Sequence, residues 1–366
     1  MLHAGDSPLG RSTLEGMTTA LTARELHSAS TVVDTHNDLI LSVTRHEPEK
    51  WGTFFREHWL PQLQQGGVNV QVLPVFLWDE HMNEGALRQW LTLLEGIQRL
   101  VDENPDTVAL CSTGADLDAA LGSGRIAMIP ALEGCAGFAA NVELIPALYR
   151  LGIRIASLTH FGRTHFADGS GEDAAGSRLT RAGVAAVIEM ERIGMIVDIS
   201  HLGFGGVMHV LDLATRPVIA THSSVRALRD HHRNLTDEQI KGVAQTGGVI
   251  GINFFAGFLT EGRSATVSDI VDHIDHVVTV AGVDHVGLGP DFIKECFDER
   301  YPLVEELWVE GIDCKQYVAG LEGPAGLPLV TEELMRRGYS EDDVRKVLGE
   351  NFVRVFRAEL GRPLKD

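Results

Sequence analysis

The sequence contains few cysteines and no long apolar run. Only four cysteines occur in 366 residues, and none of them forms a Cys-x-x-Cys pair. This pattern argues against a cysteine-rich zinc module and against a disulfide-bonded scaffold. No stretch approaches the roughly 20 apolar residues that a membrane-spanning helix needs. The first residues lack the charged and then apolar layout of a signal peptide, so we expect a cytoplasmic protein.

Positive charge and phosphate-binding loops are also scarce. The 31 basic residues face 51 acidic ones, which gives a formal net charge of −20. Such a surface repels nucleic acids and anionic membranes, so neither is an expected partner. The glycine-rich segments at 203–207 and 247–253 lack the spacing of a phosphate or dinucleotide loop, and we interpret them as turns and close packing.

Eight short apolar runs are present, and most are followed by a helical pattern. Strands that alternate with helices pair in parallel through right-handed crossovers, and continuous apolar runs fit a sheet covered on both faces. We therefore predict a (β/α)₈ barrel of the TIM type in a single domain. The alternative, an open doubly wound sheet, would more naturally have a glycine-rich loop after its first strand. The runs are 31–40, 68–78, 125–134, 153–160, 194–201, 217–224, 247–255 and 285–292.

The remaining segments are assigned around this barrel. We expect residues 1–30 to form an N-terminal arm with a leading helix and residues 31–366 to form the barrel. The aromatic-containing segment up to Gln65 is a candidate active-site loop. Residues 293–328 show little periodicity, so we predict a long loop that acts as a lid or an oligomer contact, and we expect a homodimer.

Ligand-type side chains follow six of the eight runs. In a barrel the carboxyl ends of the strands meet at one face, where active sites are built. Each residue alone could be an ordinary polar strand end, but the whole set at one face indicates a site. Histidines and carboxylates are ligands for Zn²⁺, and the set supplies three histidines, one glutamate and one aspartate with one histidine and one aspartate left over. The residues are His36, Asp38, Glu133, His160, His201, His222 and Asp291.

The sequence resembles the membrane dipeptidase family, also called peptidase family M19, of the metal-dependent amidohydrolases. The matching segments occur in family order between residues 32 and 356. They are VVDTHNDL, GGVNVQ, PALEG, SLTH, IVDISH, PVIATHSS, HRNLTDE, GLGPDF and ENFVRVF. One departure is FGRTHFADGS after SLTH, where the family often has a cysteine that forms a disulfide in secreted animal members.

The resemblance implies two Zn²⁺ per chain. His36 and Asp38 would bind one ion, His201 and His222 would bind the other, and Glu133 would bridge both. Two metals about 3.5–4 Å apart can hold a shared hydroxide and polarise one carbonyl group.

The resemblance also implies roles for three residues that are not metal ligands. His160 would hydrogen-bond the substrate carbonyl, Arg233 would pair with the terminal carboxylate, and Asp291 would carry the proton. The predicted function is therefore hydrolysis of dipeptides with a free C-terminal carboxylate. Two alternatives stay open: an amidohydrolase acting on another small amide or ester, such as an N-acyl amino acid or a lactone, and a non-catalytic metal-binding barrel.

Overall fold

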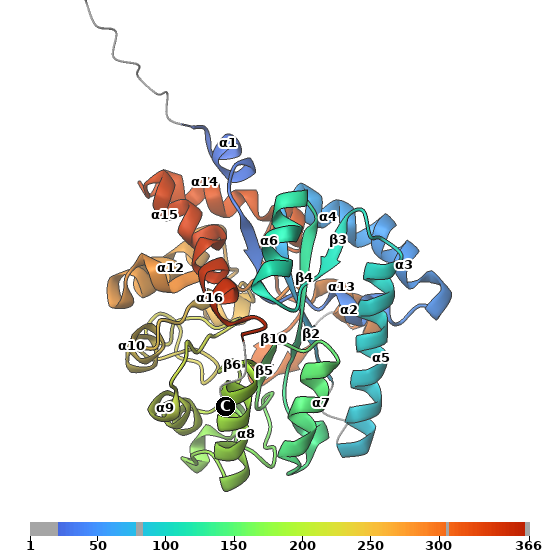
Figure 1. Cartoon of the computed structure of the whole chain (residues 1–366). Helices are drawn as coiled ribbons and strands as arrows, with labels where there is room; N and C mark the ends of the chain where they lie inside the picture. Colours follow the sequence, from blue (N-terminus) through green and yellow to red (C-terminus); the bar gives the residue numbers. More distant parts are fainter. Residues whose placement is uncertain (1–20, 78–82, 305–306, 363–366) are drawn as a thin grey trace, which may run out of the picture.

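A computed structural model describes residues 21–77, 83–304 and 307–362 of the chain (Figure 1). The predicted N-terminal arm falls largely on residues 1–20, outside the described residues, so it stays a prediction. The described part of the leading helix is α1 (Ala23–Ser28), which begins after a capping box formed by Thr22 and Glu25.

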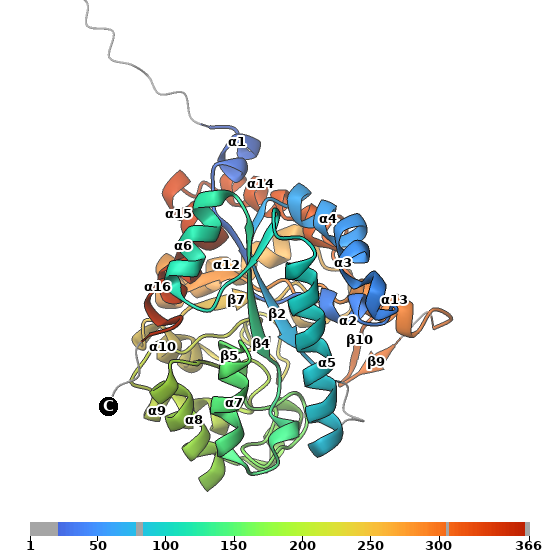
Figure 2. The same cartoon turned by 45° about the vertical axis from the view of Figure 1, so that its right-hand side comes forward.

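The strands pair in parallel and form a closed ring. Figures 1 and 2 show these strands in the interior of the molecule, with helices outside them. The main path runs β1-β2-β4-β5-β6, and β7 pairs with β8. Parallel bridges from Asp198 to Ile219 and from Ala220 to Ile250 join the two parts, and the Thr35 N–H donates to the Leu288 carbonyl to close the ring. Every predicted run contributes to it, which confirms the (β/α)₈ prediction. The named strands are β1 (Val32–Asp34), β2 (Val68–Val75), β4 (Ile126–Leu132), β5 (Ile155–Ser157), β6 (Ile196–Asp198), β7 (Ile250–Ile252) and β8 (Val286–Leu288).

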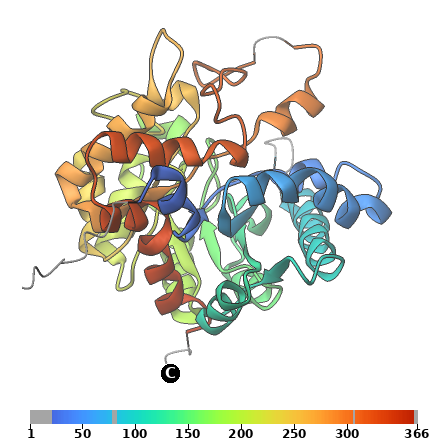
Figure 3. The same ribbon diagram turned by 90° about the horizontal axis from the view of Figure 1, so that it is seen from above.

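Helices surround this ring, and Figure 3 shows them from above. The longer ones account for the helical patterns that follow most of the apolar runs, because each presents an apolar stripe to the strands. None of the helices in the described residues has the length and hydropathy needed to cross a membrane. After α1 they are α2 (Leu39–Val43), α3 (Trp51–Phe54), α4 (Leu60–Gln65), α5 (Asn83–Asp102), α6 (Gly114–Ser123), α7 (Ile145–Arg150), α8 (Arg181–Ile193), α9 (Phe204–Leu213), α10 (Asp237–Gln245), α11 (Ala256–Leu259), α12 (Val267–Ala281), α13 (Lys294–Arg300), α14 (Pro328–Arg336), α15 (Glu341–Arg345) and α16 (Asn351–Glu359).

Both faces of the strands are buried. Neighbouring residues of β1 belong to different apolar clusters, Val32 to one and Val33 to the other. This is why the strands are almost continuously apolar in sequence. At the end of the chain α16 packs closely on β8, where a Cβ on Gly287 would lie 2.6 Å from the Phe352 ring. Only glycine allows this approach.

The structure corrects two local predictions and adds one strand. The segment before Gln65 is helical, and Trp51, Phe55 and Trp59 are buried in the core, so it is not a loop. A further strand, β3 (Val108–Leu110), pairs with β4 outside the ring and was not predicted. Residues 293–328 are not structureless, since they contain α13 and a hairpin of β9 (Trp308–Val309) and β10 (Ile312–Asp313). These elements are too short to show a period in sequence.

Candidate metal centre and active site

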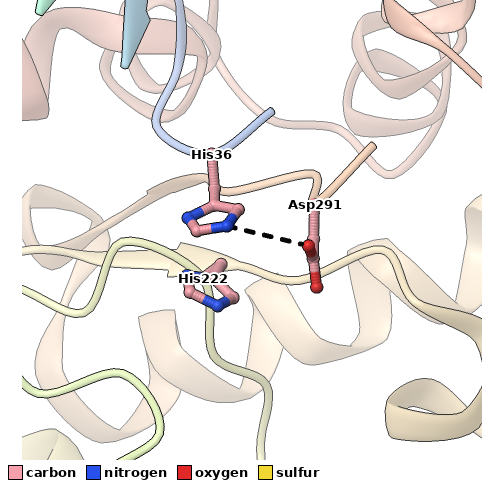
Figure 4. Close-up of side chains that lie close together, drawn as sticks. All are labelled: His36, His222 and Asp291. Carbon is pink, nitrogen blue, oxygen red and sulfur yellow. Dashed lines mark ion pairs between the residues drawn. The ribbon is translucent and has the colours of Figure 1, made fainter. Parts of the chain in front are cut away.

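The seven strand-end residues lie together at the carboxyl ends of the strands, with Glu133 at their centre. Glu133 Oε2 lies 3.2 Å from His36 Nε2, and Oε1 lies 2.9 Å from His201 Nε2 and 3.6 Å from His222 Nε2. One carboxylate thus faces ligand-type nitrogens from three strands. Figure 4 shows how His36, His222 and Asp291 approach one another from separate segments of the chain.

Three groups of side chains in this cluster have the geometry to hold a metal ion. In each group the ligand atoms lie within 4.8 Å of one another. The groups His36–Asp38–Glu133 and Glu133–His201–His222 share Glu133, as expected for a bridging carboxylate. The third brings Asp291 close to His36, with 3.9 Å between Asp291 Oδ1 and His36 Nε2. The groups are His36–Asp38–Glu133, Glu133–His201–His222 and His36–His222–Asp291.

Two of the histidines in this cluster are uncharged at neutral pH. Burial lowers the pKa of His201 and of His222 well below the usual value, and the nearby Arg233 lowers both further. A neutral imidazole offers a nitrogen lone pair to a metal. His36 differs: burial lowers its pKa, but the carboxylates of Glu133, Asp38 and Asp291 outweigh this and raise it to about 10. His36 is therefore surrounded by three carboxylates, and the same negative charge favours a divalent cation.

The buried carboxylates fit a cation. Burial raises the pKa of Asp38 well above its usual value, and the neighbouring Glu133 and Asp291 carboxylates raise it further. The buried Asp38 Oδ1 has no hydrogen-bond partner in the part of the chain that the structure describes. Three carboxylates packed together in a buried site are stabilised by positive charge. The donor set of nitrogen and oxygen atoms suits Zn²⁺.

Asp291 is held in an unusual backbone conformation. Its φ is 62°, and its N–H donates to the His36 carbonyl at 3.0 Å. His201 also has a positive φ, of 67°. Such conformations are sparsely populated by residues other than glycine, and they concentrate at functional sites. Burial raises the pKa of Asp291, whereas the His36 charge lowers it.

His222 is supported by a hydroxyl and a carboxylate. Thr221 Oγ1 lies 2.6 Å from Asp198 Oδ2 and 2.8 Å from His222 Nδ1. Because a carboxylate oxygen accepts, the Thr221 hydroxyl donates to Asp198 and its oxygen accepts from the Nδ1–H of His222. This contact selects the tautomer with a lone pair on Nε2, the atom that faces Glu133.

A pocket of about 200 Å³ opens beside the cluster. His160 is half-buried in its wall, with its ring centre 4.8 Å from that of Phe76 and 4.4 Å from that of His201. The rest of the lining is mostly apolar, and the segment at 293–328 supplies a large part of it. The lining residues from that segment are Ile293, Phe297, Tyr301, Leu307, Val309, Glu310, Ile312 and Cys314.

Arg233 is buried behind the pocket and does not line it. It is 2% exposed, and its guanidinium carbon lies 5.9 Å from the centre of the Phe258 ring, which does line the pocket. Its Nη1 donates to Ser223 Oγ at 2.8 Å and its Nη2 to the His222 carbonyl at 2.5 Å. The buried Nε has no hydrogen-bond partner among the described residues. Burial lowers the pKa of Arg233 to about 10, so the group stays charged at neutral pH.

The sequence interpretation missed three polar residues around this site. Asp198 and Thr221 support His222, and Asn253 donates to Asp291 Oδ2 at 2.8 Å. Each lies at or near the end of an apolar run, which is the only signal that the sequence contains. Their partners are contributed by neighbouring strands and become visible only in the fold.

Comparisons with known proteins agree with this geometry. Residues 21–312 and 308–363 match the family described as membrane dipeptidase (peptidase family M19). The dipeptidase verJ of Clonostachys rogersoniana is 32% identical over 272 residues, which is 74% of this chain and 65% of that protein's length. An uncharacterized dipeptidase of Schizosaccharomyces pombe is 29% identical over 91% of this chain and 82% of its own.

A solved structure has the same fold. The dipeptidase AC, a metallopeptidase of family M19, superposes with a TM-score of 0.79 at 25% identity, over 91% of this chain and 99% of that one. The superposition extends over the whole barrel. Together with the family match and the ligand-type cluster at the strand ends, it shows that this chain belongs to the membrane dipeptidase family, peptidase family M19, and is a hydrolase of the metallopeptidase type.

Proposed function

We propose that the protein hydrolyses dipeptides that have a free C-terminal carboxylate, with two Zn²⁺ ions bound per chain. The observation that carries the proposal is Glu133, which is shared by two groups of metal-ligand geometry beside a mostly apolar pocket. His36, Asp38 and Glu133 would hold one ion, and Glu133, His201 and His222 would hold the other. Bound there, the ions supply an acidified water and polarise the scissile carbonyl.

Of the three remaining residues, one transfers a proton and two stabilise negative charge on the substrate. Asp291 accepts a proton from the attacking water and returns it to the amide nitrogen as the C–N bond breaks, so that a neutral amine leaves. His160, in the pocket wall, donates a hydrogen bond to the carbonyl oxygen as negative charge develops on it. Arg233 supplies a buried positive charge for the terminal carboxylate.

A substrate panel tests the reaction class. Metal-replete protein should hydrolyse dipeptides much faster than N-acyl amino acids or lactones, as measured by release of free amino acids. Rapid turnover of lactones or N-acyl amino acids with none of dipeptides would assign the protein to the alternative amidohydrolase class. No turnover of any panel member, with both ions bound, would favour a non-catalytic barrel.

The buried charge of Arg233 leads us to expect that the enzyme prefers dipeptides with a free C-terminal carboxylate. Amidating the C-terminus of a good dipeptide should lower kcat/KM by roughly 10²-fold or more, since the substrate then lacks the negative charge that the guanidinium behind the Phe258 ring would attract. Arg233→Ala should lower activity on the free dipeptide and bring the ratio of free to amidated turnover close to one. Equal turnover of both substrates by the unmodified enzyme would limit Arg233 to its contacts with Ser223 and the His222 carbonyl.

Arg154 provides the matched control for this test. It is 9% exposed and precedes β5, at the other end of the strands, where its guanidinium donates to backbone carbonyls. Arg154→Ala should lower the thermal stability and leave the ratio of free to amidated turnover unchanged.

Thr221 predicts an effect on metal affinity. Thr221→Val keeps the shape but removes the hydroxyl that fixes His222, so zinc affinity should fall roughly 10- to 100-fold. Competition with a chromophoric chelator measures it. Thr331→Val is the control, because Thr331 Oγ1 makes a similar contact of 2.7 Å with His27 Nδ1 away from the site. Equal zinc affinity in both variants and the parent would mean that the Thr221 hydroxyl does not tune the ligand.

A further inference from the structure

Asn253 is an uncharged side chain that contacts the proposed proton carrier. It follows β7 and is fully buried. Its Nδ2 donates to Asp291 Oδ2 at 2.8 Å, and its Oδ1 accepts from the Phe255 N–H at 2.6 Å. The backbone is held as well, since Ser224 Oγ donates to the Asn253 carbonyl at 3.1 Å. Asn253 therefore has little freedom to move.

The orientation of this amide is dictated by its partners. A backbone N–H can only donate, so the oxygen of the Asn253 amide must face Phe255. The NH₂ group is then left facing Asp291. Asp291 Oδ2 is occupied by this donor, while Oδ1 points toward His36 and the metal-ligand cluster. The two oxygens of Asp291 are thus made inequivalent.

We propose that Asn253 is a positioning residue for proton transfer, which fixes the Asp291 carboxylate so that only Oδ1 accepts and returns the proton. The inference rests on the proposed function of Asp291. The last torsion of an aspartate is broad and roughly two-fold, so an unrestrained carboxylate would present either oxygen. Because the Asn253 NH₂ group donates to Oδ2, the proton taken from the attacking water goes to Oδ1. Oδ1 then passes this proton to the nitrogen of the scissile peptide bond as the C–N bond breaks.

The experiment uses two substitutions of Asn253 in the full-length, metal-replete enzyme. Asn253→Asp keeps the shape and the acceptor for Phe255 but removes the donor; Asn253→Ala removes both. We expect kcat on a good dipeptide to fall roughly 10- to 100-fold in each, the worth of a hydrogen bond to a charged group. KM should change less than about threefold, and both ions should stay bound.

A double-mutant cycle separates positioning from general damage. In an Asp291→Asn background, where the carboxylate is already gone, Asn253→Ala should lower kcat no further. Asn351 supplies the matched control: it is 3% exposed and its Nδ2 donates to the Val283 and Val286 carbonyls. Asn351→Asp should lower the melting temperature while kcat per folded molecule is maintained.

The outcomes distinguish this inference from the function on which it rests. If Asp291→Asn has near-normal kcat, the assignment of Asp291 itself fails. If Asp291→Asn is impaired while both Asn253 variants keep normal kcat, only the positioning role is overturned. Effects of the two sites that multiply in the double variant would also overturn it, because Asn253 would then act through the fold and not through Asp291.

Discussion

Replacing Glu133 with glutamine should cause loss of bound metal and loss of dipeptide hydrolysis in the same protein. Glu133 is the one side chain shared by both predicted ligand groups, and its two oxygens face His36 on one side and His201 and His222 on the other. Although burial raises the pKa of this carboxyl, the charge of His36 and the hydrogen bond from His201 hold it well below its usual range. Glu133 is therefore charged at neutral pH, and the amide of glutamine cannot supply that charge to a bound cation.

The expected loss is large because, in the proposed mechanism, the bound metals would supply the attacking water and polarise the scissile carbonyl. Their stabilisation of the transition state is worth several kcal/mol, and about 1.4 kcal/mol corresponds to a tenfold change in rate. We expect kcat/KM to fall by roughly 10³-fold or more in Glu133→Gln, with fewer than two ions bound after purification and dialysis. Metal content by mass spectrometry and dipeptide turnover are measured on the same sample.

Another buried glutamate provides the control. Glu359 on α16 is 6% exposed and pairs with Arg216 and Arg362, away from the ligand cluster. Glu359→Gln should reduce stability while two ions remain bound. A Glu133→Gln protein that retains both ions and full activity would rule out a bridging role and the shared-ligand arrangement proposed here.

The barrel was predictable because its signal is repeated. Each strand is buried on both faces and is therefore an apolar run in sequence. Eight such runs, mostly separated by helical patterns, favour a barrel over an open sheet. Elements that occur once and are short carry no such signal. The two-residue strands β9 and β10 and the three-residue β3 depend on a partner strand, which a single sequence does not reveal.

The site residues are also of two kinds, those that the sequence indicated and those that only the fold reveals. The ligand-type residues were found because charged and imidazole side chains at strand ends are conspicuous, and the fold places them together. Asn253 ends the seventh run as His222 ends the sixth, yet an uncharged amide gave no reason to assign it a role. The burial of Arg233 behind Phe258 also depends on tertiary packing. The cytoplasmic location and the homodimer stay predictions.

Asp291→Asn should leave the metals in place and remove most of the catalysis. The residue has a φ of 62°, and its N–H is bonded to the His36 carbonyl. Asparagine adopts this left-handed conformation as readily as aspartate, so the substitution adds no strain. The amide oxygen at position 291 can still accept from Asn253, which keeps the local geometry. What is lost is the oxygen facing the cluster that can take a proton.

A positioned acid or base is worth roughly 10²- to 10⁴-fold, and we expect kcat to fall by that amount while KM and metal content stay close to their original values. Metal content matters here because Asp291 also forms a group of metal-ligand geometry with His36 and His222. If Asp291 were chiefly a ligand, the variant would lose an ion along with its activity.

Asp269→Asn is the control for loss of a buried negative charge. Asp269 is a buried carboxylate at the start of α12 that pairs with Arg263. Two bound ions with near-normal kcat would instead mean that another group moves the proton, and His160, which lies in the pocket wall against the His201 ring, would be the next residue to replace.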